Sequence, residues 1–184
     1  MTVNRFFYIL MRLLNIAILG VVAVAMTRCG AINEDLPTHV ESSIIVAGDV
    51  APDFSATTLR GEEFTLSATR GEVVLLVLFS HTCPDCKALF DDLMLHKSEI
   101  ESLGVRLIAV SRGGSKDEIE AYVRDNGYDI EVIADSSKYI YYLYATTYVP
   151  RTYLIDRAGV VDSITIEFDS DHLPHIIGRI RQLI

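Results

Sequence analysis

Basic residues are in short supply in this 184-residue sequence. It has 16 Lys and Arg against 25 Asp and Glu, a formal net charge of -9, and Arg5, Arg12 and Arg28 precede every acidic residue. Because nucleic acids and anionic lipid surfaces are bound through basic patches, the acidic remainder argues against either as its partner. The sequence also lacks internal repeats and low-complexity segments. It therefore predicts one domain of ordinary size after an N-terminal targeting stretch.

Cysteine is scarce as well, and its spacing limits the chemistry. It occurs as Cys29, Cys83 and Cys86, and the last two form a single C-x-x-C. A zinc site would need a second C-x-x-C or an H-x3–5-H, whereas His172 and His175 are separated by only two residues near the C-terminus. We therefore expect no metal and no other cofactor. An inert structural disulfide remains an alternative for the pair in an exported protein.

Residues 1–28 have the pattern of a targeting segment. Residues 13–26 are apolar except for Asn15, about the length of a signal-peptide core and short for a membrane span. The alternative is an uncleaved anchor over residues 6–26, with Arg12 reaching toward the cytoplasmic side. Both alternatives predict export, with the domain at the periplasmic or other extracytoplasmic face of a bacterial cell envelope.

Cys29 separates the targeting segment from the rest of the chain. A cysteine directly after an apolar core, followed by Gly30 and polar residues, resembles the lipidation site of bacterial lipoproteins, although Arg28 stands where those proteins have a small residue. Cys29 is thus a lipidation site, a residue beside an uncleaved anchor, or a free thiol. Residues 29–45 are polar, include Pro37, and predict a flexible tether from the membrane to the domain.

Periodic patterns begin after the tether and indicate an α/β domain over residues 46–184. A hairpin is expected over residues 54–66, with a turn at Arg60 and Gly61, and a second hairpin over 152–166. The remaining expected strands are 72–80, whose continuous apolar run is typical of a strand buried on both faces, 105–110 and 130–134. The expected helices are 83–102, one from 115 onward that begins with Ser115 and Glu118 as a capping box, 136–144 and 171–184. This order predicts a central mixed β-sheet flanked by helices, with an N-terminal β-hairpin extension.

The C-x-x-C lies where a buried strand gives way to a helix. At that junction Cys83 is expected near the helix N-cap, where unpaired N–H groups and the helix dipole favour its thiolate. Pro84 falls at the first helical position, where its missing N–H costs nothing. Two intervening residues place Cys86 close to Cys83 on one helical turn, with Cys83 outward and Cys86 beneath. A redox-active dithiol is the reading that this arrangement favours.

Four stretches carry a family resemblance. They are GDVAPDF at 48–54, the Leu66-Ser67 and Arg70-Gly71 dipeptides, the strand that enters Cys83-Pro84-Asp85-Cys86, and VPRTYLID at 149–156. Together they resemble the TlpA/ResA-type branch of the thioredoxin-like superfamily, in the neighbourhood of the AhpC/TSA redoxins. The resemblance covers roughly residues 46–184. It implies a thioredoxin-like fold and an exported, membrane-tethered thiol-disulfide oxidoreductase.

The resemblance also implies roles for single residues. The proline that matches Pro150 is cis in that family and faces the cysteine pair, and Val149 before it offers backbone groups to an extended substrate. Cys83 would attack a substrate disulfide and Cys86 would resolve the mixed disulfide. The implied partners are protein disulfides and an upstream envelope reductant, and we expect the domain to act as a monomer.

The sequence departs from the family near the pair. Thr82 stands where the family has tryptophan, which this chain lacks altogether. Many members carry a buried acid that relays protons, but Val77 and Leu89, at the positions where it would lie, are apolar. Proton transfer to and from Cys86 is then left to water or to His81. As the alternative to that shuttle role, His81 is expected to be an exposed loop residue.

Two charged residues near the pair bear on its redox direction. Asp85 places a negative charge between the cysteines and opposes the helix dipole, which contributes about 0.3–1 kcal/mol at an exposed site. We therefore expect Cys83 to be only moderately activated and the pair to work as a reductant. Arg151, where relatives often have Thr, could lend positive charge near Cys83, but the general expectation for an arginine is a solvated side chain.

Two further functions remain open from the sequence. A peroxiredoxin-like peroxidase would use Cys83 on peroxides, and the segment 48–54 and the Ser80-x-x-Cys83 spacing fit it. Those enzymes, however, have a proline where this chain has Leu76, and their resolving cysteine is not two residues on. The other alternative is a non-catalytic thioredoxin-like module of an envelope complex.

Overall fold

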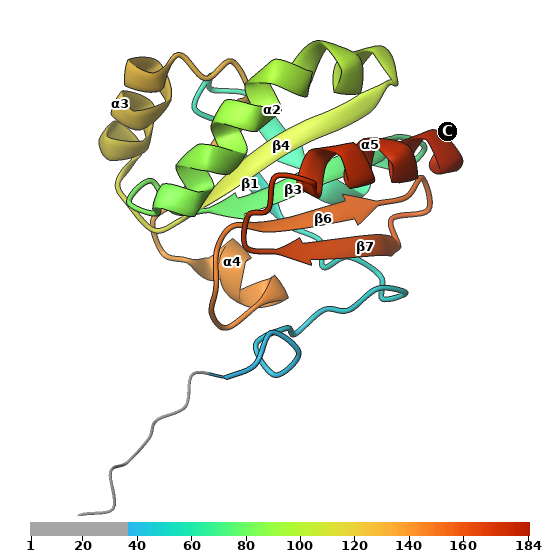
Figure 1. Ribbon diagram of the computed structural model, residues 1–184. Coiled ribbons are helices and arrows are strands. Elements are labelled where there is room, and N and C mark those ends of the chain that lie inside the picture. The colour runs from blue at the N-terminus through green and yellow to red at the C-terminus, as the bar shows by residue number, and fades with distance from the viewer. Residues whose placement is uncertain (1–36) are drawn as a thin grey trace, which may run out of the picture. The chain divides into compact units, whose positions relative to one another are not determined.

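A five-stranded mixed sheet organises residues 37–184, the part of the chain that the computed structural model describes (Figure 1). The predicted targeting segment at 1–28 and Cys29 lie outside the described residues. Within 37–184, none of the helices combines the length and the apolar character that crossing a membrane requires.

The elements follow the order that the sequence predicts. They are β1 (Ser55–Thr57), β2 (Glu63–Thr65), the 3-10 helix η1 (Leu66–Thr69), β3 (Val73–Phe79), α2 (Pro84–Ser102), β4 (Val105–Arg112), α3 (Lys116–Asn126), β5 (Glu131–Asp135), α4 (Tyr139–Tyr144), β6 (Arg151–Ile155), β7 (Val161–Ile166) and α5 (His172–Leu183). The main sheet has the order β5-β4-β3-β6-β7, in which β3, β4 and β5 are parallel to one another and β6 is antiparallel to β3 and β7. Strands β1 and β2 pair as a separate small antiparallel sheet. The predicted mixed sheet and N-terminal hairpin are confirmed.

The central strand β3 explains why both faces of the sheet are covered. All seven of its residues are buried. Val73, Leu75, Val77 and Phe79 pack with side chains of α2, α3 and α5, while Val74, Leu76 and Leu78 pack with α4 and the β1–β2 hairpin. Alternate side chains of a strand point to opposite faces, so a continuous apolar run requires an apolar layer on each side. Figure 1 shows α2 and α5 on one face of the sheet and α4 on the other.

The helix α3 begins with the predicted capping box. The Ser115 hydroxyl accepts a hydrogen bond from the Glu118 N–H, and the Glu118 carboxylate accepts one from the Ser115 N–H. The helix ends at Gly127, whose φ of 70° lies in the left-handed region that glycine adopts without a steric cost.

Residues 37–45 differ from the tether that the sequence predicts for them. The compact unit begins at Pro37. Ser43 forms a β-bridge with Ala145, and the N–H groups of Ile44 and Ile45 both donate to the Tyr144 carbonyl. Polar side chains and Pro37 indicated flexibility, but this segment finds backbone partners that are about 100 residues away in the chain and therefore left no local signal.

Candidate active site

The first turn of α2 presents the two cysteines differently. Cys83 is the N-cap, with extended φ and ψ of -93° and 121°, and Pro84 occupies the first helical turn as predicted. Cys83 is partly exposed, whereas Cys86, one turn further, is 0% exposed and packs in the core. Asp85 between them is exposed and is the acidic residue of that turn. The outward and inward placement of the pair thus follows the prediction.

The environment of Cys86 favours its neutral thiol. Burial raises the pKa of the Cys86 thiol far above its ordinary value, because a buried thiolate loses hydration. The Ser80 N–H, which donates to the Cys86 Sγ at 3.3 Å, acts in the opposite direction, and the neighbouring Cys83 and Asp85 raise the pKa further by smaller amounts. Both cysteines are free thiols in this structure.

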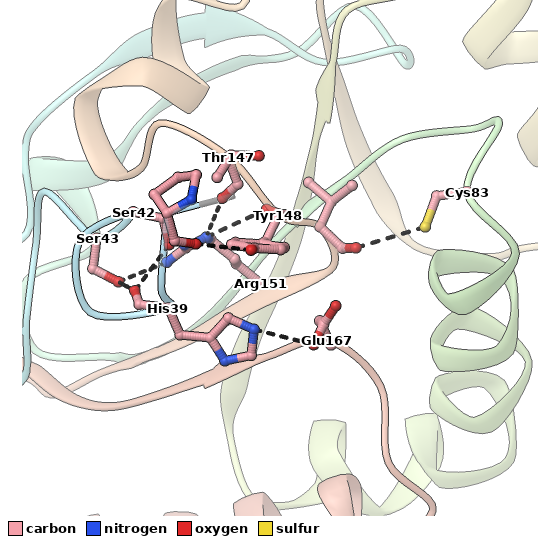
Figure 2. A network of polar contacts seen from close by, with 10 residues as sticks. His39, Ser42, Ser43, Cys83, Thr147, Tyr148, Arg151 and Glu167 are labelled. Carbon is pink, nitrogen blue, oxygen red and sulfur yellow. Dashed lines mark hydrogen bonds and ion pairs between the residues drawn. The ribbon is translucent and has the colours of Figure 1, made fainter. Parts of the chain in front are cut away.

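The loop before β6 approaches the exposed cysteine. The Val149–Pro150 peptide bond is cis, as the resemblance implies. The Sγ of Cys83 lies 3.6 Å from the carbonyl oxygen of Val149, within reach of a weak S–H donor (Figure 2). Strands β3 and β6 are paired, and they bring the two loops together although 66 residues separate them in the sequence. The structure thus gathers Cys83, Cys86, Val149 and Pro150 at one end of the sheet.

His81 is not the exposed loop residue expected as the alternative to a proton shuttle. Its ring is partly buried, and its Nδ1 is buried without a hydrogen-bond partner among the described residues. The ring fits beside Gly114, where an added Cβ would lie 3.0 Å from the His81 Cε1. Because Gly114, with a φ of 85°, has no side chain, it leaves room for the imidazole ring. This glycine on a distant loop could not be connected with His81 from the sequence.

Arg151 is also not the solvated side chain that was expected. It is 0% exposed and is the largest fully buried side chain of the described residues. Arg151 pairs with Leu78 of β3, whose side chain packs on the α4 side of the sheet. The Arg151 side chain therefore points to the sheet face opposite α2. Its sequence signal was a single basic residue in a strand, which carries no indication of depth. The contacts of Arg151 are considered below.

A cluster of aromatic side chains with Asp91 at its edge belongs to the same core layer as Cys86 and was missed from the sequence. Tyr128 is buried and donates its hydroxyl to the Asp91 carboxylate on α2 at 2.8 Å. Phe90 stacks on Tyr128, and Tyr122 packs edge-on against Phe90. Burial raises the pKa of Tyr122 to about 12, so its phenol stays protonated.

Metal binding finds no support around the pair. Among residues 37–184, no three His, Cys, Asp or Glu side chains are gathered in a way that could hold a metal ion. The groups that the structure brings together at the site are two thiols, one partly exposed and one buried, and the Val149 carbonyl.

Known thiol-disulfide proteins are similar to this chain in sequence and in fold. Over 144 residues, 77% of this chain and 83% of the relative, the chain is 28% identical to the thiol-disulfide oxidoreductase ResA of Geobacillus kaustophilus. The solution structure of a putative protein disulfide isomerase from Bacteroides thetaiotaomicron matches with a TM-score of 0.69 at 26% identity, over 77% of this chain and 92% of that one. A putative thiol:disulfide interchange protein DsbE from Chlorobium tepidum has the same fold, with a TM-score of 0.69 at 23% identity over 74% and 96% of the two chains.

The family follows from the match to its sequence profile. Residues 47–164, from the segment before β1 into β7, match the AhpC/TSA family. The matched span includes both cysteines and the Val149–Pro150 loop. The chain therefore belongs to the AhpC/TSA family.

Proposed function

We propose that this AhpC/TSA-family protein is an exported, membrane-tethered thiol-disulfide oxidoreductase of the ResA and DsbE type that works as a reductant. The observation that carries the proposal is the asymmetry of the pair. Cys83 is accessible at the start of α2 and faces the Val149 carbonyl at 3.6 Å, while Cys86 is fully buried one turn behind it. An inert disulfide needs neither a partly exposed cysteine nor a carbonyl beside it.

The proposed reaction passes two electrons from the dithiol to a protein disulfide. The Cys83 thiolate attacks one substrate sulfur, the substrate S–S bond breaks, and the departing substrate thiolate takes up a proton. Cys86 then loses its proton and attacks the Cys83 Sγ. The mixed disulfide breaks, the second substrate sulfur leaves as a thiol, and the Cys83–Cys86 disulfide forms. An upstream envelope dithiol restores the pair by the same exchange in reverse.

The surrounding residues have separate roles in this proposal. The Val149 carbonyl accepts a hydrogen bond from the backbone of an extended substrate once it is released from its contact with the Cys83 thiol. Pro150 sets the shape of that loop. Pro84 and Asp85 form the exposed rim of the first turn. His81, whose Nδ1 lacks a partner among the described residues, is a candidate for moving the Cys86 proton.

The reducing direction follows from charge. Strong disulfide oxidants stabilise their reduced thiolate form heavily. Here the exposed Asp85 carboxylate, two residues after Cys83, repels a thiolate at Cys83. Since the thiolate of the reduced form gains less stabilisation than in a strong oxidant, the disulfide form is the weaker oxidant, and the dithiol is the better reductant.

The location and partners complete the proposal. The pattern of residues 1–28, with Cys29 as lipidation site or the whole segment as anchor, supports a tether at the extracytoplasmic face of a bacterial membrane. Relatives named ResA and DsbE are thiol-disulfide proteins, which supports protein disulfides as substrates. We propose a monomer, since one chain holds the complete pair and the carbonyl beside it.

Parallel assays on the full-length protein test the activity. Insulin reduction should proceed with the wild type and fall to background in Cys83→Ser, while hydrogen peroxide should not be consumed at a comparable rate. Cys86→Ser should accumulate a mixed disulfide with its substrate through Cys83, whereas Cys29→Ser should behave as the wild type in both assays. Peroxide consumption without insulin reduction would establish the peroxidase alternative. Inactivity in both assays would leave the pair structural.

A further inference from the structure

Arg151 is tied to the loop that carries the Val149 carbonyl. Its Nε donates to the Thr147 carbonyl at 3.0 Å and to the Tyr148 carbonyl at 3.3 Å. Its Nη1 donates to the Ser43 hydroxyl at 2.9 Å, and its Nη2 donates to the Ser42 hydroxyl. One guanidinium therefore joins the segment 42–43 to the two residues before Val149 (Figure 2).

The chemistry of these contacts is unusual for a core residue. Arg151 is completely buried, yet the partners of its guanidinium are two carbonyls and two hydroxyls, all of them neutral. Burying a charge is costly unless its hydrogen bonds are satisfied. An apolar side chain would cost less free energy to bury at this strand position. The presence of an arginine is therefore explained by its hydrogen bonds to these four oxygens and not by packing in the core.

The loop itself needs such support. Tyr148 is a non-glycine residue with a φ of 67°, a left-handed conformation that holds only where the surroundings enforce it. Its carbonyl accepts from the Tyr141 hydroxyl at 2.9 Å as well as from Arg151, and its own hydroxyl donates to the Pro37 carbonyl at 2.8 Å. The ring of His39 packs edge-on against Tyr148 at 4.8 Å.

The segment 37–45 packs against this loop through backbone hydrogen bonds. Besides the Ser43–Ala145 bridge, the Ser42 carbonyl accepts from the Thr146 N–H at 2.9 Å. On the other side of Val149, the Pro150 carbonyl accepts from the Glu167 N–H at 2.8 Å, and the Glu167 carboxylate pairs with His39 at 3.1 Å. The peptide unit that carries the Val149 carbonyl thus lies between two anchored neighbours.

From these contacts we propose that Arg151, together with Ser42 and Ser43, is a positioning group that holds the Val149 carbonyl opposite Cys83 for an extended substrate. The segment 37–45 then supports the active site through the loop, although it lies on the sheet face away from α2. Neither Arg151 nor the serines touch the cysteines, so they act through the loop. The inference rests on the proposed function, because it assigns a specificity element to that reaction.

A positioning role predicts a different outcome for two kinds of substrate. An extended peptide with a disulfide uses the Val149 carbonyl, whereas the small aromatic disulfide DTNB reacts with Cys83 without backbone contacts. Loss of the serine hydroxyls should therefore lower kcat/KM for the peptide, mainly through KM, and leave DTNB reduction unchanged. A merely structural role would lower both rates together or neither.

The test uses the full-length double variant Ser42→Ala/Ser43→Ala, with Ser136→Ala as control because Ser136 is an exposed serine away from the loop. We expect a roughly three- to tenfold loss of kcat/KM for the peptide disulfide, the effect of one or two hydrogen bonds, and DTNB rates within about twofold of wild type. Faster amide hydrogen exchange over residues 146–149 should accompany the loss. Arg151→Met should lower kcat/KM for the peptide disulfide more than the exposed Arg157→Met does.

The outcomes separate this inference from the proposed function. If the wild type reduces disulfides and the serine variant handles the peptide and DTNB as the wild type does, the positioning role is wrong. A parallel loss for both substrates would equally overturn it. If the wild type reduces neither substrate, the proposed function fails and the positioning role fails with it.

Discussion

His172 should make the stability of the domain depend on pH between about 5 and 7. It is the first residue of α5, is only 3% exposed, and has its Nε2 3.0 Å from the Thr152 hydroxyl. Burial lowers the pKa of His172 from its ordinary 6.5, and this exceeds the opposing influence of the Glu167 backbone, Asp92 and Asp169. The positive end of the helix dipole also disfavours a cation at this position.

The sign follows from where the proton binds. Below about pH 6.5 the unfolded chain protonates His172, while the folded chain keeps the ring neutral down to its lower pKa. The unfolded state then binds more protons than the folded state. The contribution of the neutral His172 to the free energy of unfolding is therefore fully present above pH 6.5 and decreases as the pH falls. One proton limits the slope to about 1.4 kcal/mol per pH unit, or about 2 kcal/mol in total between pH 6.5 and 5.

Urea unfolding of the reduced full-length protein, followed by far-UV circular dichroism, measures this slope at a series of pH values. His172→Gln should remove this residue's share of the slope, whatever constant offset the substitution adds to stability. His175→Gln is the matched control, because His175 lies on the same helix but is exposed. If wild type and His172→Gln lose the same stability between pH 7 and 5, the buried-histidine reasoning is refuted.

Three further predictions concern the site and the layer beneath it. Iodoacetamide should label Cys83 of the reduced protein faster than Cys86, because Cys86 is 0% exposed and burial raises its pKa. Faster labelling of Cys86 in mass spectrometry would contradict the roles given to the two cysteines. Asp85→His should raise the reduction potential by some tens of millivolts, at about 30 mV for each 1.4 kcal/mol, because it removes a negative charge that repels a Cys83 thiolate in the reduced form; equilibration against glutathione would show no shift if that repulsion were absent. Phe90→Ala should lower the free energy of unfolding by about 3–5 kcal/mol, since the ring is fully buried, and a urea midpoint close to wild type would contradict the packing.

Local sequence patterns were sufficient for the framework of the site. The apolar run of β3 predicted a strand buried on both faces, and the structure confirms that every residue of it is buried. The Cys83-Pro84 order at a strand end predicted a helix N-terminus, and Ser115 with Glu118 predicted the next one. These features depend on neighbouring residues and on elementary preferences of the backbone, so they leave a signal within a few positions.

The resemblance to a known family supplied what composition and spacing could not. It pointed to Val149 and Pro150, and the structure places the Val149 carbonyl beside the Cys83 sulfur. Physical reasoning from the sequence had no means of pairing two loops 66 residues apart. That pairing follows from the antiparallel register of β3 and β6, which only the folded sheet determines.

The sequence by itself thus determined the elements, the cysteine pair and which of the two cysteines faces outward. Only the tertiary structure decided that Arg151 is buried, that Ser42 reaches it across 109 residues, and that residues 37–45 pack on the domain. The physical reason is that a charged side chain is buried only where distant oxygens satisfy its donors. Such partners are assembled by packing and leave no trace in the residues on either side of Arg151.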